Sequence, residues 1–366
     1  MLFADLLVYR SVFSVDELMY FDMRHIDPSF VSKANSCPVK GCTTTLHKVP
    51  YRKWLMDYCP IHKIRIHRAS RTFVYYNDDD VASKTTAPLR NILFEKDYFH
   101  SSFLGNPDKA ETTRFCNETS EDALTWNVFT SLAQAGKLLN VAFQLAPFTN
   151  VDREPELYLW GLRVDVKQRT KPDLFQPLSD ARNHFEKDIR RYRTEPDIML
   201  YIPGKLLVLI EAKFTSPNTV SDDVSRHSDK AGEKPKSRSG IIERYKLSKV
   251  YGNPLMPEKS GNMFFSQLYR NLIFAIYMSK QLNVDWAFVN LVCDQQCSLN
   301  QSNEKFSDPT HFIHSILRED LRNHFMRYSW EQLFRDFVHN ASQLTTLDEY
   351  LLNKSANLRP AFSCGG

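Results

Sequence analysis

The 366-residue chain lacks the features that mark membrane, secreted, fibrous or disordered proteins. No apolar run approaches the ~20 residues that a membrane-spanning helix needs. The first residues, MLFADLLVYRSVF, contain Asp5 and Arg10 and lack a small-residue cleavage site, so they are not expected to act as a signal peptide. With only 11 glycines and 18 prolines, a fibrous or broadly disordered chain is also excluded. We therefore expect a soluble, cytoplasmic protein with a globular core.

The chain also lacks the even set of cysteines that a disulfide framework requires, because it has seven. Four residues follow the pattern C-x4-C-x16-C-x2-H: Cys37, Cys42, Cys59 and His62. Two close pairs of soft ligands suit tetrahedral Zn²⁺, and four protein ligands leave no open position, so we predict a structural zinc. His47 and His67 are alternatives to His62, and free buried cysteines are the alternative to a metal site.

Positive charge is concentrated around this cysteine cluster. Residues 33–72 hold nine basic side chains and one acid, Asp57, which gives a charge of +8 in a chain of net charge +4. The basic residues are Lys33, Lys40, Lys48, Arg52, Lys53, Lys63, Arg65, Arg68 and Arg71. Such a patch favours phosphate backbones, and Tyr51, Trp54 and Tyr58 are available to stack on bases. We expect a zinc-stabilised module that aids DNA binding, with a merely solvated basic surface or a dimerisation module as alternatives.

Helix and strand patterns alternate in the middle of the chain. Helices are expected at 120–137, 180–193 and 262–282, and strands at 140–148, 156–166, on both sides of a turn near Pro203, and at 284–293. This order predicts an α/β core with a mixed sheet flanked by helices.

We divide the chain into four parts on these patterns. They are an N-terminal region with the basic zinc module (1–72), a linker (73–118), the α/β core (119–295) and a helical C-terminal region (296–366). Residues 216–248 are too polar to bury much surface, so they are expected to form a mobile insertion in the core.

Charged side chains end the most apolar strand of the core, LLVLIEAKF at 206–214. Because side chains alternate along a strand, Glu211 and Lys213 share a face with Leu207 and Leu209. Both faces are apolar, so the strand is central and covered on both sides. A charged pair left unpaired at the end of such a strand would cost several kcal/mol. A divalent metal held by carboxylates would compensate.

Asp197 lies on the preceding strand, and the turn between the strands decides where it points. A three-residue turn at 203–205 places Asp197 opposite Glu211 on the same face, whereas a two-residue turn pairs it with residue 210 on the wrong face. With the first turn, the two carboxylates can hold Mg²⁺ (or Mn²⁺) for phosphodiester hydrolysis. Lys213 can then orient the attacking water and offset charge in the transition state.

Pro196-Asp197, a spacer of thirteen residues and Glu211-Ala212-Lys213 together resemble the signature of the PD-(D/E)xK nuclease superfamily. The resemblance covers about 119–295 and implies a restriction-endonuclease-like core, Mg²⁺ dependence and cleavage of nucleic acid, usually DNA. It implies a bacterial-type member to which an N-terminal zinc-finger-like module is added.

The same resemblance implies two further catalytic residues. Glu121, at the start of the 120–137 helix, matches a third acidic residue of many members, with Asp122 as the second choice. Gln267 matches a glutamine that some members place on the helix after the lysine strand, and Arg270 follows it. RecB-like members carry a tyrosine four residues after that glutamine, where this chain has Asn271.

The function that we predict is a Mg²⁺-dependent deoxyribonuclease, most simply an endonuclease. The intact set of Asp197, Glu211 and Lys213 favours it over a non-cleaving DNA-binding or scaffold protein on a decayed nuclease fold, and over an adaptor whose zinc module binds protein. A homodimer would supply the two active sites that double-strand cleavage requires. The resemblance implies a role in restriction or defence.

Overall fold

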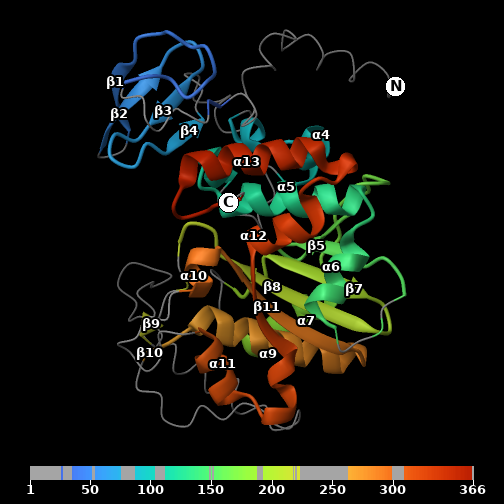
Figure 1. The fold of residues 1–366 in the computed structure, drawn as a ribbon. Coiled ribbons are helices and arrows are strands. Elements are labelled where there is room, and N and C mark those ends of the chain that lie inside the picture. The colour runs from blue at the N-terminus through green and yellow to red at the C-terminus, as the bar shows by residue number, and fades with distance from the viewer. Residues whose placement is uncertain are drawn as a thin grey trace. The chain divides into compact units, whose positions relative to one another are not determined.

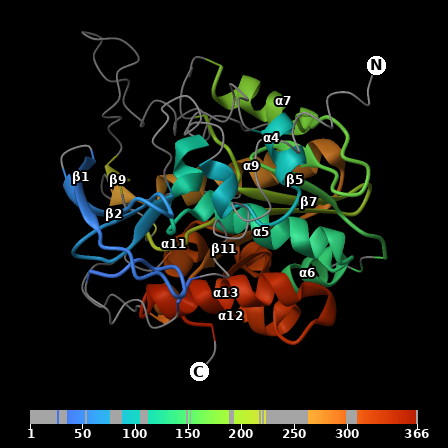
Figure 2. The ribbon, with the colours of Figure 1, turned by 90° about the horizontal axis from the view of Figure 1, so that it is seen from above.

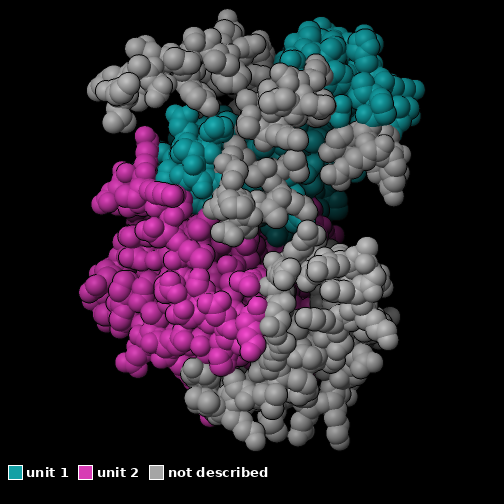
Figure 3. All heavy atoms as spheres, turned by 180° about the vertical axis from the view of Figure 1, so that it is seen from behind, with its two compact units in different colours: residues 1–131, 334–366 teal, residues 132–333 magenta. Residues whose placement is uncertain are grey.

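The computed structural model describes residues 26–27, 35–51, 54–75, 87–103, 112–147, 150, 152–187, 193–216, 218, 221–222, 263–298 and 309–364. The chain forms two compact units, one of residues 1–131 with 334–366 and one of residues 132–333 (Figure 3). Most of the insertion expected at 216–248 falls outside the described residues, and the domain boundaries at 72, 118 and 295 stay predictions.

The second unit is built on a mixed sheet of six described strands in the order β12-β11-β8-β7-β5-β6 (Figure 1). These strands are β5 (Glu156–Leu159), β6 (Leu162–Val164), β7 (Ile198–Ile202), β8 (Leu206–Ala212), β11 (Asp285–Val292) and β12 (Phe325–Ser329). β8, β11 and β12 run parallel to one another, while β7 is antiparallel to β8 and to β5. A separate antiparallel pair joins β9 (Ser221–Asp222) to β10 (Met263–Phe264).

Helices cover one face of this sheet through a single apolar cluster. They are α7 (Gln176–Phe185), α9 (Ser266–Leu282) and α11 (Pro309–Ile316), which pack with Leu207 and Leu209 of β8. Figures 1 and 2 show α9 lying along the strands β8 and β11. Every residue of β8 is buried, as expected for a central strand covered on both faces. The predicted α/β fold with a mixed sheet and flanking helices is confirmed.

Two segments of the second unit differ from the prediction. Residues 140–148, predicted as a strand, fall largely in helix α6 (Leu138–Leu145), where the buried residues recur at helical spacing. A short apolar run can form either element, and here the helical period decides it. The C-terminal region is helical as predicted, with α10 (Asp294–Ser298) across its start and α12 (Trp330–Leu333) and α13 (Thr345–Leu358) within it, but it also adds β12 to the edge of the sheet.

The first unit begins with an antiparallel sheet in the order β1-β2-β3-β4. Its strands are β1 (His47–Tyr51), β2 (Trp54–Cys59), β3 (Ile64–Ile66) and β4 (Phe73–Tyr75). The expected linker contains the short 3-10 helices η3 (Pro88–Asn91) and η4 (Thr112–Cys116) and helix α4 (Lys96–Ser102), and it leads to α5 (Glu121–Gln134). Phe99 and Phe103 stack edge-on against Trp126 of α5, with ring centroids 4.7 and 5.0 Å apart. The expected linker therefore forms part of a packed core.

A buried polar network ties α13 to the start of α5. The Glu118 carboxylate accepts hydrogen bonds from the Asn357 amide at 2.9 Å and from the Phe73 backbone N–H at 3.2 Å. The Lys354 ammonium donates to the backbone carbonyl of Glu118. Burial raises the pKa of Glu118 to about 7 and lowers the pKa of Lys354 to about 8. Both charges are therefore costly to bury, and the hydrogen bonds offset part of that cost.

Candidate functional site

The turn between β7 and β8 has the three residues that the metal site requires. Ile202 pairs with Leu206 and Ile198 pairs with Ile210, so residue 197 lies across from residue 211 on the same face. Gly204 permits the turn, because its φ of +73° lies in the left-handed region. The Asp197 carboxylate accepts a hydrogen bond from the backbone N–H of Ala212 at 2.9 Å. The register that the sequence left open is thus the one that brings the two carboxylates together.

Glu211 is fully buried, and both of its carboxylate oxygens accept hydrogen bonds. Lys213 Nζ donates to Oε1 at 2.5 Å, and Asn271 Nδ2, from α9, donates to Oε2 at 2.5 Å. The backbone of Lys213 is also fixed, because its N–H donates to Leu291 O at 2.7 Å and its carbonyl accepts from Trp330 Nε1 at 3.1 Å. The carboxylate and the ammonium are therefore held side by side at the carboxyl end of β8.

A row of polar residues continues across the sheet from this point. Asn290 of β11 is the register partner of Glu211, and Arg327 of β12 is the partner of Asn290. Asn290 Nδ2 donates to the Glu211 carbonyl at 3.3 Å, and its side-chain oxygen accepts from Asn218 at 2.7 Å. The carboxyl ends of the three parallel strands thus carry a polar strip in an otherwise apolar sheet.

The predicted catalytic residues do not all fall in one unit. Asp197, Glu211 and Lys213 are neighbours in the second unit, whereas Glu121 is the half-buried first residue of α5 in the first unit. Gln267 is exposed near the start of α9, and Asn271, one turn later, makes the contact with Glu211. Catalytic roles for Glu121 and Gln267 stay predictions.

Sequence reasoning gave no role in the site to Asn271 and Asn290. The available signal was a buried-looking amide inside an apolar run, NLIFAIY for the first and WAFVNLV for the second. A polar side chain in such a run is normally buried only with a hydrogen-bond partner, so each run indicated a hydrogen bond to a distant residue that the sequence does not identify.

The donor set around Glu211 fits a hard divalent cation. Asp197 and Glu211 supply carboxylate oxygens from adjacent strands, and such ligands suit Mg²⁺ or Mn²⁺. In addition, the buried Asn271 Oδ1 is an acceptor with no hydrogen-bond partner among the described residues. Lys213 is a donor only, so it lies beside the metal position without being a ligand.

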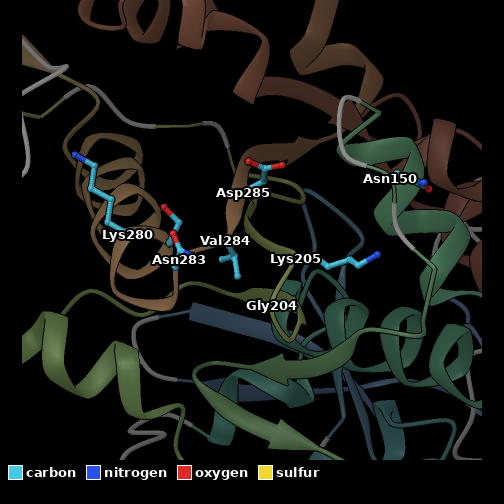
Figure 4. A pocket seen from close by; sticks show the side chains of 8 residues that line it. Asn150, Gly204, Lys205, Lys280, Asn283, Val284 and Asp285 are labelled. Carbon is cyan, nitrogen blue, oxygen red and sulfur yellow. The ribbon is translucent and has the colours of Figure 1, made fainter.

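A pocket of about 600 Å³ opens at the other end of β8, on the amino edge of β8 and β11 (Figure 4). It is lined by Asn150, Gly204, Lys205, Ser279, Lys280, Asn283, Val284 and Asp285. Its two lysines extend in opposite directions in Figure 4, and Lys205 instead pairs with Asp152 at 2.9 Å. The lining therefore shows no converging catalytic set.

The first unit holds the predicted cysteine cluster. One ligand atom from each of Cys37, Cys42, Cys59 and His62 lies within 4.8 Å of all the others. Zn–S bonds of about 2.3 Å and Zn–N bonds of about 2.0 Å place tetrahedral sulfur atoms about 3.8 Å apart, and sulfur and nitrogen about 3.5 Å apart. Cys42 and Cys59 Sγ are 4.0 Å apart, and His62 Nδ1 is 3.4 and 3.5 Å from Cys37 and Cys59 Sγ. The cluster can therefore hold zinc, with His62 as the fourth ligand.

The thiols of this cluster differ in their readiness to ionise. A hydrogen bond with Cys37 lowers the pKa of Cys59 to about 4, and the same hydrogen bond raises the pKa of Cys37. The thiolate is the form that binds metal, so the hydrogen bond with Cys37 favours the metal-binding form of Cys59 without a bound ion.

Arg90 supports the loop that carries His62. The buried guanidinium donates to the carbonyls of His62 at 2.5 Å and Lys63 at 3.0 Å, and it lies over the ring of Tyr75 at 4.8 Å. Burial lowers the pKa of Arg90 to about 9. The arginine therefore fixes the ligand loop from the neighbouring 3-10 helix η3.

The surface of the basic module differs in part from the prediction. Tyr58 is only 8% exposed, so it is not free to stack on a base as expected. The single acid of residues 33–72, Asp57, is buried and pairs with Arg71 at 3.8 Å. Leu55 and Ile61 are exposed large apolar side chains on the same module.

A mixed sheet flanked by helices carries Glu211 and Lys213 at the end of its central strand and Asp197 just before the neighbouring strand, an arrangement typical of restriction-endonuclease-like proteins. Residues 115–354 match the model of the family described as Restriction Endonuclease associating with ARP. The match covers more than half of the chain, so the chain belongs to this family; the cysteine cluster lies outside the matched residues. No curated protein and no solved structure matches the chain.

None of the helices in the described part of the chain is both long enough and apolar enough to cross a membrane.

Proposed function

We propose that the chain is a divalent-metal-dependent deoxyribonuclease of the PD-(D/E)xK type, with Asp197, Glu211 and Lys213 in its active site. The observation that carries the proposal is the register of β7 and β8, which brings residue 197 opposite residue 211 while the Lys213 ammonium lies 2.5 Å from the Glu211 carboxylate. Membership in a restriction endonuclease family supports the same chemistry and a role in defence.

Asp197 and Glu211 would hold the metal, and Mg²⁺ or Mn²⁺ there supplies a Lewis acid that polarises the phosphate and activates water. The chain's own groups prepare the site. The Ala212 N–H donates to one oxygen of Asp197 at 2.9 Å and so orients this carboxylate. Lys213 carries a positive charge at the point where negative charge develops on the phosphate, and burial beside β8 strengthens its effect. Glu121 as a third carboxylate and Gln267 as a substrate contact belong to this proposal.

We propose further that Zn²⁺ bound by Cys37, Cys42, Cys59 and His62 stabilises the basic module. The ligand distances match a tetrahedral site. A module of 40 residues or fewer usually needs a metal or disulfides to fold.

DNA is the partner that the charge of this module favours. Residues 33–72 carry +8, and their one acid is buried in an ion pair, so the exposed charge is basic. A homodimer would provide two active sites for cleavage of both strands. The protein would act in the cytoplasm, where restriction enzymes meet foreign DNA.

The decisive experiment is digestion of linear, circular, single-stranded and branched DNA with Mg²⁺ or Mn²⁺, comparing wild type, Lys213→Ala and Lys205→Ala. We expect cleavage by wild type, loss of at least about 10²-fold in Lys213→Ala, and near-normal cleavage by Lys205→Ala. Lys205 is the matched control because it lies at the opposite end of β8 in a half-exposed ion pair. Failure of wild type to cleave any DNA would leave a non-cleaving DNA-binding or scaffold protein as the function.

A further inference from the structure

Two consecutive residues of α9 each contact a fully buried carboxylate in the second unit. Asn271 Nδ2 donates to Glu211 Oε2 at 2.5 Å, and Arg270 NH1 lies 3.7 Å from Glu186 Oε1. Glu211 belongs to the proposed active site, but Glu186 does not. A buried carboxylate away from the chemistry is costly unless it is paired, so its contacts indicate what it holds in place.

Glu186 follows α7 and holds the segment that leads to Asp197. Its Oε2 accepts from the Thr194 backbone N–H at 2.8 Å, and its Oε1 accepts from the Thr194 hydroxyl at 2.5 Å. Arg182 of α7 donates to the Thr194 carbonyl at 2.9 Å. Thr194 thus has its backbone N–H, its backbone carbonyl and its side chain fixed, and only Glu195 and the buried Pro196 separate it from Asp197. Proline restricts the backbone, so the direction in which Asp197 leaves this segment is fixed as well.

Asn271 holds the other carboxylate directly. Glu211 lies between two donors, Lys213 on Oε1 and Asn271 on Oε2, so its orientation is set from both sides. The side chain of Asn271 is 1% exposed, and its Oδ1 has no hydrogen-bond partner among the described residues. Buried amides normally satisfy both of their groups, so Oδ1 indicates a donor such as water that enters the site when it is in use.

We propose that Arg270 and Asn271 are the positioning residues of the nuclease site, Asn271 by orienting Glu211 and Arg270 by acting through Glu186 and Thr194 on the segment of Asp197. One turn of α9 thereby keeps both carboxylates at the separation that a single divalent cation requires. This inference rests on the proposed function, because it concerns the same metal site.

The first test measures Mn²⁺ binding in the absence of DNA by calorimetry, with the full chain. Asn271→Leu keeps the approximate volume and removes both polar groups, and we expect Mn²⁺ to bind about 10-fold more weakly. Gln281→Ala, an exposed change on the same helix, should bind Mn²⁺ as wild type does. A merely structural role would lower the melting temperature of Asn271→Leu without changing Mn²⁺ affinity, and that result would overturn the proposal for Asn271.

The second test is a double-mutant cycle of Arg270→Met and Glu186→Gln. Arg270→Met removes the guanidinium that lies 3.7 Å from the buried Glu186 carboxylate, and we expect Mn²⁺ affinity to fall about 5-fold. Adding Glu186→Gln neutralises that charge and keeps acceptor and donor groups near Thr194, so the double variant should recover most of the loss. Additive effects of the two changes would show that Arg270 does not act through Glu186. If Arg270→Met does not fold, Arg270→Lys, which retains the charge, takes its place. Its Mn²⁺ affinity should lie within about 2-fold of the wild-type affinity. A loss of affinity as large as that expected for Arg270→Met would count against the proposal.

The two proposals fail in different ways. If wild type binds no Mn²⁺ and cleaves no DNA, the nuclease function is wrong. If wild type binds Mn²⁺ and cleaves DNA, and Asn271→Leu and Arg270→Met bind Mn²⁺ as tightly as wild type does, only the positioning role is wrong.

Discussion

The cysteine cluster of the first unit and the carboxylate pair of the second unit are both candidate metal sites, but they are assembled from very different lengths of chain. The four ligands of the cluster lie between residues 37 and 62, around one small antiparallel sheet. The carboxylates come from two strands of a buried sheet, and the residues that orient them include Asn271, which is 60 positions from Glu211. The first site is local, whereas the second is made by the tertiary fold.

This difference predicts opposite responses to metal removal. The local cluster should lose its structure without zinc, because zinc binding supplies on the order of 10 kcal/mol to comparable small modules. The carboxylate site should keep its structure without Mg²⁺, because hydrogen bonds and apolar packing already hold Glu211 and Lys213.

The largest expected effect is therefore that of removing zinc. A strong chelator, or Cys59→Ser, should expose residues 33–72 to limited proteolysis while the second unit stays resistant. Elemental analysis should find one zinc per wild-type chain and none in Cys59→Ser. As a control, Asp197→Asn should retain its zinc. Absence of zinc from wild type would mean that the cluster is a set of free cysteines, and equal protease resistance with and without zinc would show that the metal does not stabilise the module.

Loss of Asp197 should have the next largest effect, and it should fall on activity alone. Asp197→Asn keeps the shape of the side chain and weakens metal binding, so we expect a fall in cleavage rate of about 10²–10³-fold. The melting temperature should change little, because an amide oxygen can still accept from the Ala212 N–H. Urea unfolding and DNA cleavage measured on the same samples check both parts. A large loss of stability with normal cleavage would contradict the proposed site.

These two sites were also predictable to different degrees. Spacing alone identified Cys37, Cys42, Cys59 and His62, since local ligands leave a local pattern. The pair Asp197 and Glu211 was also predicted, but the turn that decides their register was left open, and the structure shows three residues in it. Long-range partners could not be read from the sequence, because the positions that Asn271, Asn290 and Glu186 contact depend on how helices and strands pack.

Prediction from local sequence patterns was wrong where the same pattern is compatible with two structures. The apolar residues of 138–145 form a helix, although a strand was predicted, because a short apolar run does not decide between them. Tyr58 was expected to face DNA because the segment is basic, but it is buried together with its neighbours Met56, Asp57 and Cys59 in β2.

A smaller effect is expected at Arg90, which connects the zinc loop to the rest of the first unit. Arg90→Met removes the donors to His62 O and Lys63 O, and we expect the unfolding free energy of the first unit to fall by about 2–3 kcal/mol. Zinc should also be released at a lower chelator concentration, because the ligand loop is less fixed. Arg68→Met is the matched control, because Arg68 is an exposed arginine of the same module and should cost less than about 0.5 kcal/mol. If Arg90→Met and Arg68→Met release zinc at the same chelator concentration, the contact of Arg90 with the loop that carries His62 does not contribute to zinc retention.

The smallest effect concerns pH and the buried network of the first unit, where Glu118, like Glu211 in the second unit, accepts from an asparagine amide. Burial raises the pKa of Glu118 to about 7, so its contribution to stability is full below its ordinary value and is lost as pH rises through the folded pKa. Between pH 5.5 and 7.0, wild type should therefore lose about 1–2 kcal/mol of unfolding free energy relative to Glu118→Gln, because each pKa unit corresponds to about 1.4 kcal/mol and Glu118 is half ionised near pH 7.

Urea unfolding at several pH values tests this expectation. Only the pH dependence of the difference is compared, so the constant cost of losing the contact with the Phe73 N–H cancels. Lys354 lies next to Glu118, but its lowered pKa of about 8 keeps it charged over this range, so it does not add to the slope. Glu349→Gln, an exposed change on α13, should leave the wild-type pH dependence intact. The difference in unfolding free energy between wild type and Glu118→Gln could instead stay constant from pH 5.5 to 7.0. That result would show that Glu118 is ionised over the whole range, because Lys354 and Asn357 stabilise its charge more strongly than burial opposes it.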